Sequence, residues 1–173
     1  MIIIYVAIGL VALVLLAAAI ASKTYSISSV KEVNLPKTKV YDFIVLLKNQ
    51  NKFSKWALID PNMQTTFRGE DGKVGFVSAW ESNDKNVGKG EQEITAIDAG
   101  RQISYEIRFE RPFKSTGNAT MLIEAINEHS TRVTWTFFGS MPYPFNLMSV
   151  VMKKAIANDL AVGLNNLKAL LEG

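Results

Sequence analysis

The sequence predicts an α+β protein in which a curved antiparallel sheet of seven strands is folded around one long C-terminal helix, behind an apolar N-terminal helix. Residues 2–21 are uncharged and mostly apolar, which is typical of a membrane span. Residues 63–139 alternate apolar and polar side chains between turn residues, with no helical pattern between the segments. Residues 144–172 carry apolar side chains at steps of three or four, and a helix of that length, about 40 Å, needs a broad apolar surface to pack against.

The composition sets the size of the domain and excludes several kinds of site. The 173 residues suffice for one domain with a sizeable core, and the absence of cysteine excludes disulfides, a thiol nucleophile and a cysteine metal site. The net charge is +3, and residues 22–56 hold seven lysines against Glu32 and Asp42. Such a segment either lies near anionic headgroups or simply keeps the domain soluble. No arginine cluster is interleaved with aromatic residues, which argues against nucleic-acid binding.

The apolar run over residues 2–21 is long enough to cross a hydrocarbon core of about 30 Å. A cleaved signal peptide usually opens with a basic residue and has a shorter apolar core, although Ala19-Ile20-Ala21 does resemble a cleavage site. We therefore expect a membrane anchor over residues 1–22 and a separate domain over residues 23–173. Lysines follow the span, so the positive-inside rule favours a cytoplasmic domain. A periplasmic or secreted domain, released by signal cleavage, is the alternative.

The domain is expected to begin with one strand and two short helices. Residues 24–35 alternate apolar with polar side chains and predict the strand. Pro36 suits the first turn of a helix that continues to about residue 48, with its apolar side chains on one face. A second short helix or turn is expected over residues 52–58, around Trp56.

Six further strands follow, with turn residues between them. They are expected at residues 63–68, 74–82, 87–98, 102–110, 118–126 and 131–139. The fourth of these is the clearest, because Tyr105 and Phe109 fall on one face and Arg108 on the other. Consecutive strands without intervening helices predict an antiparallel meander. The pair Gly88 and Gly90 lies within this strand pattern and predicts a β-bulge rather than a phosphate-binding loop.

The C-terminal helix is expected over residues 144–172, with Pro144 in its first turn. Its apolar stripe includes Met148 and Met152 in the first half and Leu160 in the second. Methionine is flexible, so the first half would make an adaptable wall for a ligand. Ordinary core packing explains the same stripe equally well.

Several stretches, in this order, resemble the START-like superfamily, also described as polyketide cyclase/dehydrase-like or birch-pollen-allergen-like. They are Val33-Asn34-Leu35-Pro36 with Val40-Tyr41-Asp42-Phe43-Ile44, Phe53-Ser54-Lys55-Trp56, Gly75 with Trp80-Glu81-Ser82-Asn83, Val87-Gly88-Lys89-Gly90-Glu91-Gln92, Thr131-Arg132-Val133-Thr134-Trp135 and Gly163-Leu164-Asn165-Asn166-Leu167-Lys168. The resemblance covers essentially everything after Lys23. It implies a helix-grip fold, in which the sheet curls around the C-terminal helix, and a cavity between the two for an apolar ligand.

The residues give little support for catalysis. The single histidine, His129, lies among turn residues, and no nucleophile is paired with a base. Glu91 and Glu93 share one face, which is exposed if Gln92 faces the core; the alternative, a buried carboxylate pair, would suggest acid–base chemistry. We therefore expect no catalytic residue, no metal site and no cofactor.

The predicted function is that of a membrane-anchored protein which binds a hydrophobic small molecule or lipid between the sheet and the C-terminal helix. The expected ligand-binding residues are Trp80, Gln92, Tyr105, Phe109, Trp135, Met148 and Met152. Buried polar groups among them need a partner, which a ligand headgroup, a water or the protein itself would supply. Two alternatives remain open: a cyclase- or dehydrase-type enzyme acting on such a ligand, and a non-catalytic interaction subunit of a membrane complex with unknown protein partners.

Overall fold

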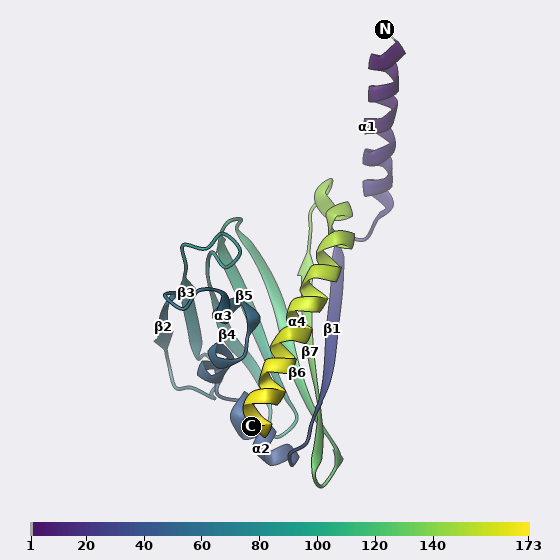
Figure 1. The fold of residues 1–173 in the computed structure, drawn as a ribbon. Helices are drawn as coiled ribbons and strands as arrows, with labels where there is room; N and C mark the ends of the chain where they lie inside the picture. Colours follow the sequence, from purple (N-terminus) through teal and green to yellow (C-terminus); the bar gives the residue numbers. More distant parts are fainter. Residues whose placement is uncertain (1) are drawn as a thin grey trace.

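The structure, a computed structural model, describes residues 2–173 and contains one sheet, one long C-terminal helix and one isolated N-terminal helix (Figure 1). Helix α1 (Ile2–Ile20) extends away from the rest of the molecule. The strands are β1 (Thr24–Val33), β2 (Gln64–Arg68), β3 (Val77–Glu81), β4 (Lys89–Asp98), β5 (Gln102–Arg111), β6 (Ser115–Asn127) and β7 (Ser130–Ser140). Between β1 and β2 lie three short helical pieces, and α4 (Ser149–Glu172) closes the chain.

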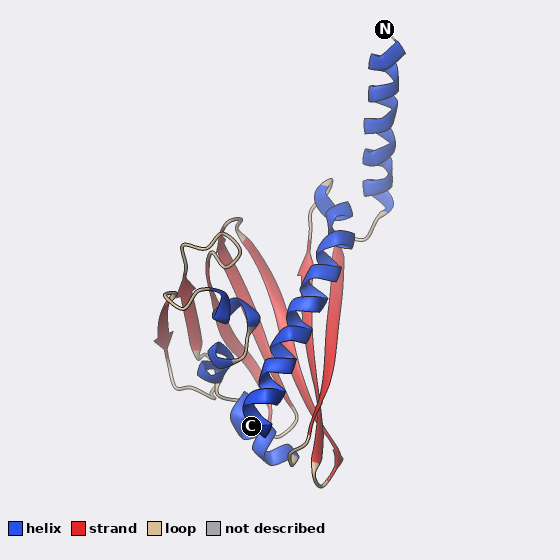
Figure 2. Cartoon of the chain, in the orientation of Figure 1, coloured by secondary structure: helices blue, strands red, loops and turns tan. Residues whose placement is uncertain are grey.

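The seven strands form a single antiparallel sheet in the order β1-β7-β6-β5-β4-β3-β2, with α4 lying across one face (Figure 2). Each strand from β2 to β6 pairs with the next along the chain, and β1 pairs with β7. This arrangement confirms the predicted α+β helix-grip fold. The predicted bulge is also present, as a register shift between Lys89 and Gly90 in the β4–β5 pairing.

The face of the sheet that α4 covers, here called the helix face, carries the core. On β5 it is formed by Ile103, Tyr105, Ile107 and Phe109, and on β7 by Val133, Trp135 and Phe137. The remaining side chains of these strands, including Arg108 and Phe138, form the outer face. Alternation along a strand assigns residues to the two faces, and the burial of Tyr105 and Val133 confirms the predicted assignment.

The region between β1 and β2 differs from the prediction of two short helices, the first continuing to residue 48. Helix α2 (Lys37–Ile44) ends early, the 3-10 helix η1 (Leu47–Lys52) follows, and α3 (Lys55–Ile59) is a single short turn of helix. The Asp71 carboxylate, in the β2–β3 turn, accepts hydrogen bonds from the backbone N–H groups of Leu47 (2.7 Å) and Lys48 (3.3 Å). This contact, between segments distant in the sequence, satisfies the first N–H groups of η1 and stabilises its separate start.

Helix α4 is held against β1 and α3 mainly through its C-terminal half. Leu160, Leu164 and Leu167 are each at most 1% exposed, and Asp159 forms an ion pair with Lys55 of α3. Asn166 donates a hydrogen bond to the Phe53 carbonyl oxygen at 3.1 Å. The apolar stripe therefore corresponds to core only along the second half of the helix.

The first half of the C-terminal segment differs from the prediction. It begins with the 3-10 helix η2 (Phe145–Met148), and Met148 is 57% exposed rather than buried. Phe145 and Val151 are also exposed, at 61% and 76%. The periodicity of the stripe identifies one face of a helix, but the sheet does not extend far enough to cover that face along its whole length.

Candidate ligand-binding site

The helix face has an open end, at the edge of the sheet where β1 begins and β7 ends, where apolar side chains are only half-buried. These residues are Tyr25, Trp80, Ile107, Phe109, Phe137 and Met152. Trp80 and Phe109 contact each other edge to face, with ring centroids 6.0 Å apart. Trp80 and Phe109, two of the predicted ligand-binding residues, therefore lie together at this end, and Met152, a third, is half-buried in the first half of α4.

Three aromatic rings at the open end lie directly against glycines of neighbouring strands. A Cβ atom added to Gly90 would lie 2.7 Å from Cζ2 of Trp80, and one added to Gly117 would lie 2.7 Å from Cζ of Phe137. Gly139 stands in the same relation to the Tyr25 ring. Each ring therefore lies so close to the backbone of the neighbouring strand that only a glycine fits beneath it.

The other predicted residues lie deeper on the same face and already have protein neighbours. Trp135 packs edge to face against Phe53 and Trp56, with ring centroids 5.9 and 6.3 Å away. The Nε2 group of Gln92 donates a hydrogen bond to Oε1 of Gln50 at 3.1 Å. Gln92 and Trp135 thus belong to the core between the sheet and the short helices.

The polar groups of Trp80 and Tyr105 have contrasting surroundings. The indole Nε1 of Trp80 donates to the Val87 carbonyl oxygen at 3.2 Å, so the protein itself provides its partner. The Tyr105 hydroxyl is buried and has no hydrogen-bond partner within residues 2–173. Burial raises the pKa of this phenol far above its ordinary value, and the nearby Asp71 charge adds to the effect. Tyr105 is therefore a neutral hydroxyl that can offer a hydrogen bond to a water or to a polar atom of a ligand.

Met148 and Met152 lie in different environments. Met152 is half-buried and borders the open end, whereas Met148 points outward from η2. The expected burial of Met148 is wrong, for the reason given above. No observation tests ligand binding by any of the seven predicted residues, so those roles stay predictions.

Two residues that shape the packing between the sheet and α4 were missed at the sequence level. Phe137 could have been found, because it lies two residues after Trp135 on the same strand and so on the same face. Gly163 could not, because its role depends on another element: a Cβ there would lie 2.8 Å from Cζ3 of Trp135. A glycine in the interior of a long helix is therefore explained by the indole that packs against it.

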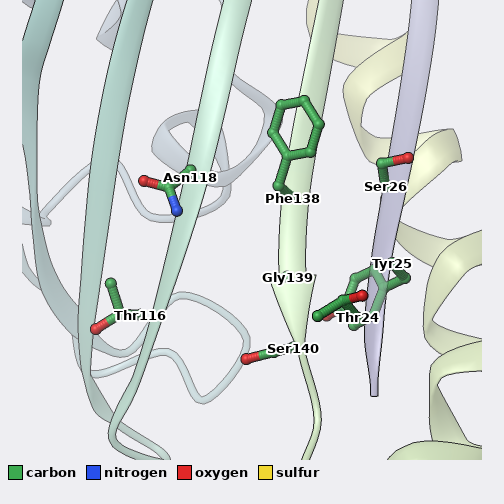
Figure 3. A pocket seen from close by; sticks show the side chains of 8 residues that line it. All are labelled: Thr24, Tyr25, Ser26, Thr116, Asn118, Phe138, Gly139 and Ser140. Carbon is green, nitrogen blue, oxygen red and sulfur yellow. The ribbon is translucent and has the colours of Figure 1, made fainter. Parts of the chain in front are cut away.

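Two hollows lie on the outer face, away from α4. The first, of about 470 Å³, is formed by Thr24, Tyr25, Ser26, Thr116, Asn118, Phe138, Gly139 and Ser140, and Figure 3 shows these side chains with the α4 ribbon behind the strands. The second, of about 660 Å³, is formed by Glu91, Arg108, Phe109, Glu110, Lys114, Ser115 and Thr116. Both are shallow surface depressions lined largely by polar side chains, so neither resembles an apolar binding site.

The outer face also carries the carboxylates that were considered for acid–base chemistry. The Arg108 guanidinium pairs with Glu91 at 2.8 Å, with Glu93 at 2.7 Å and with Glu106. Hydrogen bonds from Arg68 and then Arg108 lower the pKa of Glu91 below its ordinary value. The buried carboxylate pair is therefore ruled out: these carboxylates belong to a surface ion-pair network. Within residues 2–173, no group of three or more His, Cys, Asp or Glu side chains could hold a metal ion.

Comparisons with known proteins agree with this architecture. The model of the family described as "Polyketide cyclase / dehydrase and lipid transport" matches residues 24–172. Comparison with curated proteins finds no match.

Similar solved structures share the fold at low sequence identity. Norcoclaurine synthase from Thalictrum flavum, in complex with dopamine and hydroxybenzaldehyde, has a TM-score of 0.65 and 10% identity, over 89% of each chain. A Thermobifida fusca protein has a TM-score of 0.61 and 18% identity, over 84% of this chain and 92% of its own. Ara h 8.0201 has a TM-score of 0.54 and 15% identity, over 83% of this chain and 98% of its own. At these identities the likeness establishes the fold alone.

Proposed function

Because the chain belongs to the polyketide cyclase/dehydrase and lipid transport family, we propose that it is a membrane-anchored protein which binds a hydrophobic small molecule or lipid at the open end of the helix face. Family membership supports the binding of a hydrophobic ligand. The observation that carries the location is the half-burial of Trp80, Phe109, Phe137 and Met152 on one surface. Water meets these apolar side chains at a cost of roughly 25 cal/mol per Å² of exposed apolar area, which an apolar ligand would remove.

The anchor is proposed from helix α1. Its 19 residues have a mean hydropathy of 3.0, and only 6% of this apolar segment is buried in the protein. Both a membrane-spanning helix and a signal sequence have these properties. The Asn146 side chain favours the anchor. Its Nδ2 group donates to the carbonyl oxygens of Ala18 (2.7 Å) and Ala21 (3.0 Å), and cleavage after Ala21 would separate the buried amide from both residues. The division at residue 22 and the cytoplasmic placement, which rests on the lysines after the span, belong to this proposal.

The proposed site is tested by filling it. We expect Met152→Trp to lower uptake of an apolar fluorescent probe at least tenfold, while the free energy of unfolding changes by less than about 1 kcal/mol, because the side chain grows into free space. Leu170→Trp is the matched control: it adds the same ring to an exposed position near the far end of α4 and should leave uptake unchanged.

Two results would contradict the proposal. If the wild-type chain takes up no apolar probe, and Met152→Trp destabilises it by about 1–3 kcal/mol, the open end is packed core. The alternative of a non-catalytic interaction subunit would then be favoured. If uptake is unchanged in Met152→Trp, the ligand binds elsewhere.

A further inference from the structure

We propose that the end of the domain around η2 inserts into the surface of the bilayer that holds α1, so that the open end of the helix face receives its ligand from the membrane rather than from water. The inserting surface, here called the docking edge, consists of residues 143–151 together with Phe113. The inference rests on the proposed membrane anchor and adds the route and the source of the ligand.

The depth of the docking edge follows from the hydrogen bonds of Asn146. Its side chain contacts the carbonyl oxygens of Ala18 and Ala21, so η2 lies beside the last turn of α1 (Figure 1). If α1 spans the hydrocarbon core, its last turn reaches the headgroup region. Phe145 and Met148, in the same short helix as Asn146, therefore lie at that depth as well.

The docking edge exposes large apolar side chains. The exposed fractions are 45% for Tyr143, 61% for Phe145, 70% for Val150, 76% for Val151 and 80% for Phe113. Aromatic side chains are enriched at the membrane–water interface, where their apolar bodies leave water. Such exposure close to a span is explained by insertion into the interface.

The sheet register brings Phe113 to the same end of the molecule as η2. Asn118 of β6 pairs with Phe138 of β7, so the start of β6 lies beside the end of β7. Phe113 is in the hairpin just before β6, and η2 soon follows β7. Backbone pairing thus places two separate apolar projections on one edge, as insertion into a plane requires.

Charge gives a second, independent reason to choose a lipid surface over a protein partner. Lys23, Lys114, Lys153 and Lys154 are exposed and lie next in sequence to the docking edge or to the end of α1. An apolar patch bordered by lysines matches an apolar interior under anionic headgroups, because the headgroups attract the lysine ammonium groups. The surface therefore fits a bilayer with anionic lipids.

The open end of the helix face adjoins this edge. Met152 follows Val151 in α4, and Phe109 precedes the hairpin that carries Phe113. Insertion would bring these half-buried apolar side chains to the headgroup region. An acyl chain could then pass from the bilayer onto the helix face without crossing water, which avoids the hydrophobic cost of exposing its CH₂ groups.

The experiment uses the full chain reconstituted alone into phosphatidylcholine/phosphatidylglycerol vesicles. Because the chain has no cysteine, single substitutions Phe145→Cys, Phe113→Cys and Leu170→Cys can each carry one environment-sensitive fluorophore. We expect blue-shifted emission, quenched by lipids brominated near the headgroup, at positions 145 and 113. Position 170, which is also exposed but lies near the opposite end of α4, should report water.

The outcomes separate this inference from the proposed anchor. A chain that is extracted from vesicles by carbonate overturns both. A chain that stays in the membrane while positions 145 and 113 report water overturns the docking edge and leaves the anchor. Shielding of these positions in native membranes but not in vesicles would assign the edge to a protein partner and also overturn the inference.

The route is tested separately with a pyrene-labelled fatty acid. The double variant Phe145→Ser/Val151→Ser should slow uptake from vesicles at least fivefold, while uptake from a soluble cyclodextrin complex stays as in the wild type. Equal slowing from both donors would mean that the substitutions damage the site itself. Equal, wild-type rates from both would mean that the ligand does not enter through the docking edge.

Discussion

Substitution of Gly163 by alanine tests how closely α4 grips the sheet. Alanine stabilises the interior of a helix by about 1 kcal/mol relative to glycine, so the backbone alone predicts a more stable protein. At Gly163, however, the added Cβ would lie 2.8 Å from Cζ3 of Trp135. That indole is held between Phe53 and Trp56 and cannot move aside freely. Overpacking of this kind costs about 1–3 kcal/mol, so we expect Gly163→Ala to lower the free energy of unfolding by about 1 kcal/mol.

The sign should reverse when the indole is removed. Phenylalanine at position 135 lacks the Cζ3 atom, so Gly163→Ala in the Trp135→Phe background should stabilise the protein by about 1 kcal/mol. Urea unfolding in mild detergent, followed by far-ultraviolet circular dichroism, gives the four free energies of this double-mutant cycle. Ala155→Gly, at an exposed position of α4, calibrates the helix propensity. The packing argument fails if Gly163→Ala stabilises both backgrounds equally.

Three further predictions follow from other contacts. Leu160→Ala should lower the free energy of unfolding by about 2–5 kcal/mol, because Leu160 is only 1% exposed. Leu170→Ala should lower it by less than about 1 kcal/mol, because Leu170 is 47% exposed. Equal costs would contradict the assigned buried face of α4. The pKa of Glu91 is lowered in the folded protein, so its carboxylate stabilises the fold above the ordinary glutamate pKa near 4.5, and this stabilisation is lost as the pH falls through the lower folded pKa. Glu91→Gln should therefore reduce the loss of stability in acid, measured by urea titrations over a pH series. An unchanged dependence of stability on pH would contradict this. Asn146→Ala should speed proteolysis near residues 21–23 in vesicles, because α1 loses a side-chain contact at its end; an unchanged rate, or a mature chain that begins at Ser22, would contradict the anchor arrangement.

The faces of the strands could be predicted from the sequence because alternation is a local property. On β5, Tyr105 is buried and Arg108 lies on the outer face, as their odd and even positions require. The long helix and the bulge at Gly90 were predictable for the same reason: periodicity and glycine placement depend on residues a few positions apart. The family resemblance then supplied the helix-grip arrangement, which the structure confirms.

What the sequence could not decide depends on contacts between distant segments. The separate start of η1 after the early end of α2 depends on the Asp71 carboxylate, which lies in another turn and accepts a hydrogen bond from the Leu47 N–H group. The exposure of Met148 depends on how far the sheet reaches beneath α4, which no periodicity within the helix encodes. The close packing of the Trp80 ring on Gly90 likewise depends on two strands that meet only in the folded sheet. A pattern along the chain specifies which face of an element is apolar, but only the packing of elements determines how much of that face is covered and how much is left for a ligand or a membrane.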